Sequence, residues 1–138
     1  MERYLGKYST WLYATLRVVA GLMFALHGTQ KLFGWPPGQG GGRPEVGSLI
    51  WIGGVIELVT GLLIAIGLFT GWAAFIASGM MAVAYFMAHA SGGFLPIVNR
   101  GELAVLYCFV FLYIASRGTV ACGVDTAIGR PGVRARTS

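Results

Sequence analysis

The chain has 138 residues, of which 56% are hydrophobic and only 11% are charged, and its mean hydropathy is +0.70. Soluble domains carry about 25% charged residues, so this chain lacks the charge that a water-facing surface needs. We attribute the formal net charge of +5 to membrane topology and anionic lipid headgroups, and we expect no nucleic-acid partner. The composition predicts an integral membrane protein whose main partner is the lipid bilayer.

Four apolar stretches are long enough to be considered as membrane spans, for which about 20 mainly apolar residues are needed, with a range of roughly 17 to 25. They are residues 11–33, 48–69, 71–90 and 101–117, and a basic tail, 118–138, follows them. The stretches use most of the chain, so residues 1–138 are predicted to form a single domain. We expect an all-α membrane protein, an antiparallel bundle of four transmembrane helices, with a flexible tail.

The distribution of Lys and Arg predicts the orientation. Arg3 and Lys7 precede the first stretch, and the last stretch ends with or is followed by Arg117, Arg130, Arg134 and Arg136. With four spans these residues share one side of the membrane, and only Lys31, Arg43 and Arg100 lie on the other. Because an excess of Lys and Arg marks the cytoplasmic face, both termini are expected in the cytoplasm.

Glu57 lies near the middle of the second apolar stretch. A central acidic residue costs about 2.5 kcal/mol or more on insertion, and such residues normally face the protein interior with a partner. Gly53 and Gly61 precede and follow it at intervals of four residues, which places Glu57 on a close helix contact. Glu57 therefore marks a candidate functional site.

Further polar residues are predicted to gather at the outer side of the bundle. The expected set is His27, Lys31, Glu57, His89, Asn99 and Glu102, with Tyr85 and Phe109 lining an adjacent ring slot. This set suits a proton relay or hydrogen bonding to a quinone, with Tyr85 and Asn99 in supporting roles. Arg17, on the inner side, is expected to form a structural ion pair with Glu57. Two alternatives stay open: Lys31 and Arg17 snorkel to an interface, and Glu102 is an interfacial loop charge.

Several short motifs accompany these residues: Arg17 with His27-Gly28-x-x-Lys31, Gly54-x-x-Glu57-x-x-x-Gly61, Ala84 with His89, Asn99-x-Gly101-Glu102, and Gly123-x-Asp125. In this order they resemble the DoxX family of small four-helix membrane proteins. The resemblance implies an inner-membrane protein linked to oxidoreductase systems. Its relatives include the small membrane subunit of thiosulfate:quinone oxidoreductase and a membrane partner of superoxide-detoxifying and sulfurtransferase enzymes. This chain lacks a paired-cysteine motif.

Four functions remain open at this point. The first is a membrane subunit of a quinone-linked oxidoreductase that takes electrons from a partner and is not active alone, because the sequence has no iron–sulfur or dinucleotide motif. The second is a non-catalytic anchor or assembly factor for other subunits or for further copies of the chain. A haem or metal site on His27 and His89 is a lesser alternative, and a transporter is the last. Quinone is the cofactor that the first function implies.

Overall fold

The computed structural model describes residues 1–37 and 43–129, and these fold into helices without any β-strand. A short helix α1 (Glu2–Leu5) and a 3-10 turn (Gly6–Tyr8) lead directly into α2 (Ser9–Phe33). The other helices are α3 (Leu49–Ile66), α4 (Thr70–Ala84), α5 (Pro96–Asn99), α6 (Glu102–Arg117) and α7 (Val124–Ala127). The predicted all-helical fold is confirmed. Arg130, Arg134 and Arg136, with the rest of the distal tail, lie outside the described residues.

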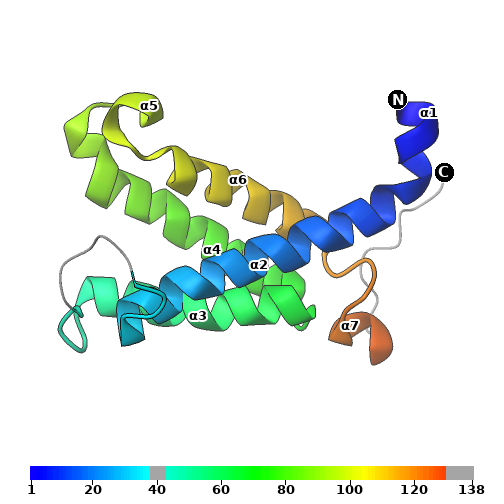
Figure 1. Ribbon diagram of the computed structural model, residues 1–138, viewed down its shortest axis with the longest axis horizontal. Helices are drawn as coiled ribbons and strands as arrows, with labels where there is room; N and C mark the ends of the chain where they lie inside the picture. Colours follow the sequence, from blue (N-terminus) through cyan, green and yellow to red (C-terminus); the bar gives the residue numbers. More distant parts are fainter. Residues whose placement is uncertain (38–42, 130–138) are drawn as a thin grey trace.

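The helices α2, α3, α4 and α6 run alongside one another in alternating directions (Figure 1). One end of the bundle, which we call the termini end, carries the start of α2, the α3–α4 turn, the end of α6, and α7. The opposite end, the loop end, carries the α2–α3 connection and the segment between α4 and α6, which includes α5. The helix boundaries follow the predicted apolar stretches closely, because those stretches are bounded by glycine, proline or charged residues.

Three helical segments are long and apolar enough to cross a bilayer. They are Glu2–Phe33, Leu49–Ile66 and Thr70–Gly92. Helix α6 has 16 residues, just below the usual range of about 17 to 25. Large apolar side chains such as Leu22, Phe75 and Phe109 remain exposed on the outside of the bundle, as expected for a surface that meets lipid tails.

Close backbone contact joins α2 to α3. A Cβ atom added to Gly28 would lie 2.5 Å from the Leu58 amide nitrogen, and one added to Gly61 would lie 2.6 Å from the Ala25 amide nitrogen. Only glycine permits this approach at these positions. The predicted stripe is confirmed at Gly61 and wrong at Gly53, which has no neighbour within 4 Å of an added Cβ atom; Gly54 takes that place in the contact.

Helix α4 packs against α6 and then widens. In the packed part, the Ser78 hydroxyl donates a hydrogen bond to the Cys108 carbonyl at 2.8 Å. The last turn, Tyr85–His89, is a π-helix in which the Ala90 amide donates to the Tyr85 carbonyl. Single π-turns in helices occur frequently at functional sites, and this one sets the direction of His89.

Candidate functional site

Glu57 is buried at the α2–α3 contact, with 2% of its surface exposed. Lys31, from the last turns of α2, brings its Nζ to 2.5 Å from Glu57 Oε1. The Lys31 side chain is 37% exposed, so the pair connects a buried carboxylate with the surface of the loop end. The predicted placement of Glu57 at a helix contact with a charged partner is therefore confirmed, but the partner is Lys31.

The predicted Arg17–Glu57 ion pair is wrong. The guanidinium of Arg17 is completely buried and donates to four backbone carbonyls: Ile64 at 2.6 Å, Ala65 at 3.0 Å, Cys122 at 2.7 Å and Ala121 at 3.3 Å. The reason is the register of the antiparallel helices, which sets Gly21 against Gly61 and Ala65. Arg17 thus lies level with the end of α3, about two helical turns beyond Glu57.

Asp125 complements Arg17 at the termini end. Its carboxylate accepts from the Phe69 amide at 3.1 Å, the Thr70 amide at 3.2 Å and the Thr119 hydroxyl at 2.8 Å. The acid thereby satisfies donors at the start of α4, while Arg17 satisfies acceptors at the end of α3. We call Arg17, Thr70, Thr119 and Asp125 the termini cluster. It fastens the segment after α6 to the α3–α4 turn.

A pocket of about 290 Å³ opens at the loop end, and we call it the loop-end pocket. The polar residues that line it come from α2, α3, the π-turn and the start of α6: His27, Lys31, Glu57, His89, Arg100 and Tyr107. Apolar side chains such as Phe24 and Met81 complete its walls. The pocket therefore combines a carboxylate, two imidazoles, two cations and a phenol in a largely apolar setting.

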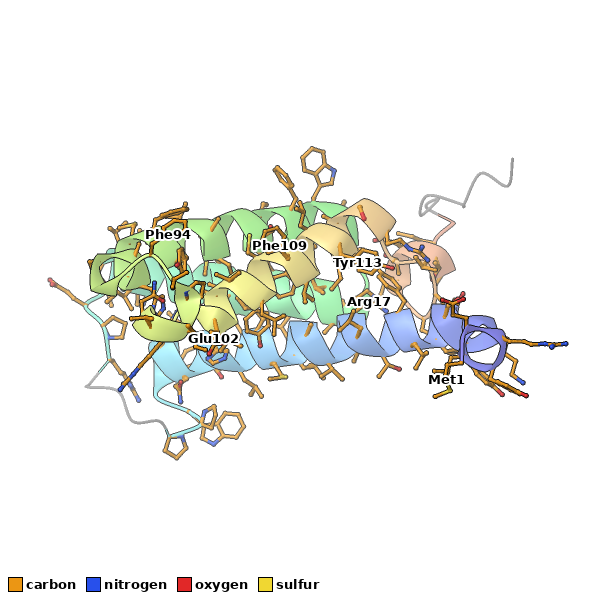
Figure 2. All side chains as sticks on the ribbon, turned by 90° about the horizontal axis from the view of Figure 1, so that it is seen from above. Met1, Arg17, Phe94, Glu102, Phe109 and Tyr113 are labelled. Carbon is orange, nitrogen blue, oxygen red and sulfur yellow. The ribbon has the colours of Figure 1, made fainter. Side chains whose placement is uncertain are left out.

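The structure brings together four of the residues predicted for the site, namely His27, Lys31, Glu57 and His89. The predicted position of Glu102 is wrong: its side chain is exposed and is not among those lining the pocket. In Figure 2, Glu102 and Arg17 lie towards opposite ends of the bundle. Helix α6 instead lines the pocket with Leu103, Ala104 and Tyr107.

Asn99 and Tyr85 support His89 without lining the loop-end pocket. The Asn99 carbonyl lies 3.1 Å from His89 Nδ1, and because a carbonyl only accepts, Nδ1 carries the hydrogen and leaves Nε2 of the neutral ring as an acceptor. The Asn99 amide donates to the Tyr85 hydroxyl at 3.1 Å. Tyr85 and Phe109, predicted to line a ring slot beside the cluster, border a second, apolar pocket of about 380 Å³ between α4 and α6, which shares Met81 with the loop-end pocket.

Comparison with known proteins assigns the chain to a family. The DoxX family model matches residues 12–90. The chain belongs to the DoxX family. It is also 46% identical over 125 residues to a protein of Haemophilus influenzae strain Rd described as uncharacterized, an alignment that covers 88% of this chain and 93% of that protein. No solved structure matches the chain. The DoxX segment contains α2, α3, α4 and the π-turn, and so holds the four predicted residues of the pocket.

The predicted site did not include two of the polar residues that line the pocket of this DoxX family member, Arg100 and Tyr107. Tyr107 is the buried one. It is 6% exposed, and its ring packs on Phe24 and Phe111 and lies 6.2 Å, centroid to centroid, from the edge-on ring of His27. The sequence pattern that could have indicated Tyr107 is the helical spacing of the residues that form the buried face of α6: Ala104, Tyr107, Phe111 and Ile114.

Two oxygen atoms of the site remain unsatisfied. Neither the Tyr107 hydroxyl nor Glu57 Oε2 has a hydrogen-bond partner within the part of the chain that the structure describes. Buried polar atoms nearly always have a hydrogen-bond partner, so both atoms are available to bind a ligand. The haem or metal site on His27 and His89 stays a prediction: both line the pocket, and among residues 1–37 and 43–129 no three His, Cys, Asp or Glu side chains gather as a metal-binding group.

Proposed function

We propose that this DoxX family protein is a multi-pass inner-membrane subunit of a quinone-linked oxidoreductase, with a quinone-binding and proton-relaying site in the loop-end pocket. The observation that carries the proposal is the hydrogen bonding of Glu57, which lines the pocket. Its Oε1 atom is paired with Lys31, and its Oε2 atom is buried without a hydrogen-bond partner among the described residues. A partner subunit supplies the electrons in this proposal.

The chemistry of the lining supports the assignment. A quinone ring requires an apolar slot, and its two oxygens require hydrogen-bond donors and groups that carry protons. Lys31, His27 and Tyr107 offer donors, and Glu57 and His89 offer sites that take up protons. The volume of about 290 Å³ lies at the lower limit of small-molecule sites, about 300 Å³, which favours a single ring with its isoprenoid tail outside the pocket.

The membrane arrangement in this proposal has four spans. Helix α6 packs antiparallel to α4 (Figure 1), and its 16 residues extend about 24 Å. An even number of spans puts Arg3, Lys7 and Arg117 on one side, which the positive-inside rule assigns to the cytoplasm. The loop-end pocket then opens towards the outer leaflet.

Binding of a short-chain quinone to the detergent-solubilised protein tests the proposal. Glu57→Gln exchanges a carboxylate that only accepts for an amide that also donates, with little change in shape, so we expect it to strengthen quinone binding about threefold or more. Glu45→Gln is the matched control, since Glu45 is an exposed carboxylate in the α2–α3 connection, and it should leave binding unchanged.

The same measurements separate the alternative of a non-catalytic anchor. If no quinone binds, and a soluble enzyme co-purifies equally with the unaltered protein and with Glu57→Gln, the anchor role replaces the proposed one. Equal quinone affinity of Glu57→Gln and the unaltered protein would remove Glu57 from the site.

A further inference from the structure

The two unsatisfied oxygens of the loop-end pocket make different demands on a ligand. Glu57 uses Oε1 in its ion pair with Lys31, and its second oxygen, Oε2, is a carboxylate acceptor that requires a donor. The Tyr107 hydroxyl is able both to donate and to accept. The structure does not join these two atoms by a hydrogen bond, so each remains available for a third group.

One common functional group satisfies both atoms at once. A hydroxyl donates its hydrogen to a carboxylate oxygen and accepts through a lone pair from a phenol. A carbonyl oxygen accepts only; it can pair with Tyr107, but it leaves Glu57 Oε2 buried without a donor and brings a second partial negative charge towards it. Leaving such an acceptor unpaired in a buried site is strongly unfavourable.

We propose that the loop-end pocket recognises a hydroxyl group, and that it therefore binds the reduced hydroquinone form of its ligand more tightly than the oxidised quinone. This inference rests on the proposed function and specifies which redox form the site selects. In the bound state Glu57 Oε2 accepts the ligand O–H, and Tyr107 donates to the same ligand oxygen. His27, with its ring edge-on to Tyr107, lines the adjoining wall.

A ligand reaches these atoms through the exposed part of the pocket wall. Both oxygens are shielded from solvent, so a lining side chain must shift to admit a ligand. Arg100 and Leu103 are exposed and belong to the segment that leads into α6. Lys31 is half-exposed at the same rim. The exposed or half-exposed residues of the lining thus include Lys31, Arg100 and Leu103, whereas Glu57 and Tyr107 are buried.

Three probes of closely similar shape test the inference on the full chain in detergent under nitrogen: decyl-benzoquinone, its hydroquinone, and the dimethyl ether of that hydroquinone. The ether retains the ring and tail, has no O–H donor and is not readily oxidised. Calorimetric titration should give a hydroquinone affinity about tenfold higher than that of either other probe, the factor expected for one hydrogen bond to a charged acceptor.

Two variants assign the roles. Glu57→Gln provides an amide that donates as well as accepts, so the preference for hydroquinone should fall below about threefold. Tyr107→Phe removes a partner that serves both redox forms, so both should bind more weakly while the preference persists. Tyr113→Phe is the matched control, because Tyr113 lies on the same helix with an exposed ring outside the pocket, and it should change nothing.

The outcomes distinguish the inference from the proposed function. Equal affinity for quinone and hydroquinone in the unaltered protein overturns the inference and leaves the proposed function standing. A tenfold preference that survives in folded Glu57→Gln also overturns it, because Glu57 is then not the acceptor. If neither form binds, the proposed function fails and the inference fails with it. The comparison of the three probes uses the unaltered protein, so it tests the inference even if a variant fails to fold.

Discussion

At the residue scale, two of the buried charged side chains, Arg17 and Glu57, are held in different ways. Arg17 uses both terminal nitrogens of its guanidinium, Nη1 and Nη2, to donate to four backbone carbonyls, two of them at the carboxyl end of α3, where the helix dipole favours a cation. Glu57 has one ion-pair partner and one unpaired oxygen. Arg17 is therefore a structural residue, whereas Glu57 is built for a contact that the chain alone does not make.

Arg17→Met is predicted to destabilise the protein by about 3 kcal/mol or more, since buried carbonyls lose a charged donor. Thermal unfolding in detergent would show the loss, and Arg17→Lys should recover only part of it because an ammonium cannot reproduce the planar fork. Arg3→Gln, at an exposed position, serves as the control. A change no larger than that of the control would contradict the structural role.

The predictions for individual residues that were wrong or incomplete have a common cause, which is that the sequence does not reveal how the helices face one another. Glu102 and Tyr107 lie on different faces of α6, and the helix is apolar nearly all round, so hydrophobic periodicity does not reveal which face turns inward. The charge of Glu102 suggested a site residue on a face of the helix that is in fact exposed, while Tyr107 lies on the buried face. The Arg17 partner was misassigned because the antiparallel register of α2 and α3 depends on glycine contacts, which only the folded structure fixes.

At the element scale, the α2–α3 pair is the most closely packed part of the molecule. Membrane helices gain little from burying apolar surface against each other, so close contact between small residues becomes the main source of attraction. Gly21, Gly28 and Gly61 each bring one backbone against the other. This contact also holds Lys31 level with Glu57, so the packing of the two helices and the geometry of the site are one property.

Gly61→Ala and Gly53→Ala form a matched pair on one helix. The added methyl group at residue 61 would lie 2.6 Å from the Ala25 amide nitrogen, whereas at residue 53 it meets nothing within 4 Å. We predict that Gly61→Ala destabilises the protein by about 1 to 3 kcal/mol through overpacking, and that Gly53→Ala is neutral or stabilising because alanine favours the helix. Thermal unfolding of both would check this; equal effects would refute the contact.

The existence and limits of the four long helices were within reach of the sequence. Continuous apolar runs of spanning length have few alternatives in a membrane, where backbone groups must be paired within the segment. Within the tail that follows the fourth stretch, the structure forms the short helix α7. The π-turn at Tyr85–His89 was beyond prediction, because it arises from the contacts of Tyr85 and His89 with Asn99 and not from local propensity.

At the scale of the whole molecule, the two ends have separate tasks. The termini cluster closes one end with hydrogen bonds from Arg17 and to Asp125, and the loop-end pocket at the other end contains two oxygen atoms that have no hydrogen-bond partner within the described residues. The bundle thus carries the termini cluster and the loop-end pocket at opposite ends. A change in the tail is expected to act on folding, and a change near the loops is expected to act on ligand binding.

The proposed orientation predicts which thiols are accessible from outside the cell. Cys122 is exposed at the termini end, so a membrane-impermeant maleimide should not label it in intact cells and should label it after permeabilisation. A Glu45→Cys variant in a Cys108→Ala background places a thiol at the loop end and should be labelled without permeabilisation. Mass spectrometry of the modified protein would report both sites, and the reverse pattern would invert the topology.

Because of the π-turn, the geometry of the site depends on the number of residues between Tyr85 and His89 as well as on their identity. A π-turn holds one residue more than a regular helical turn, and here the π-turn ends at His89. A relative with a single deletion between Tyr85 and His89 would keep its helices and its hydropathy profile, yet its imidazole would be rotated by about 100°, away from Glu57. Two chains of this family with identical polar residues can therefore differ in activity through one gap in their alignment.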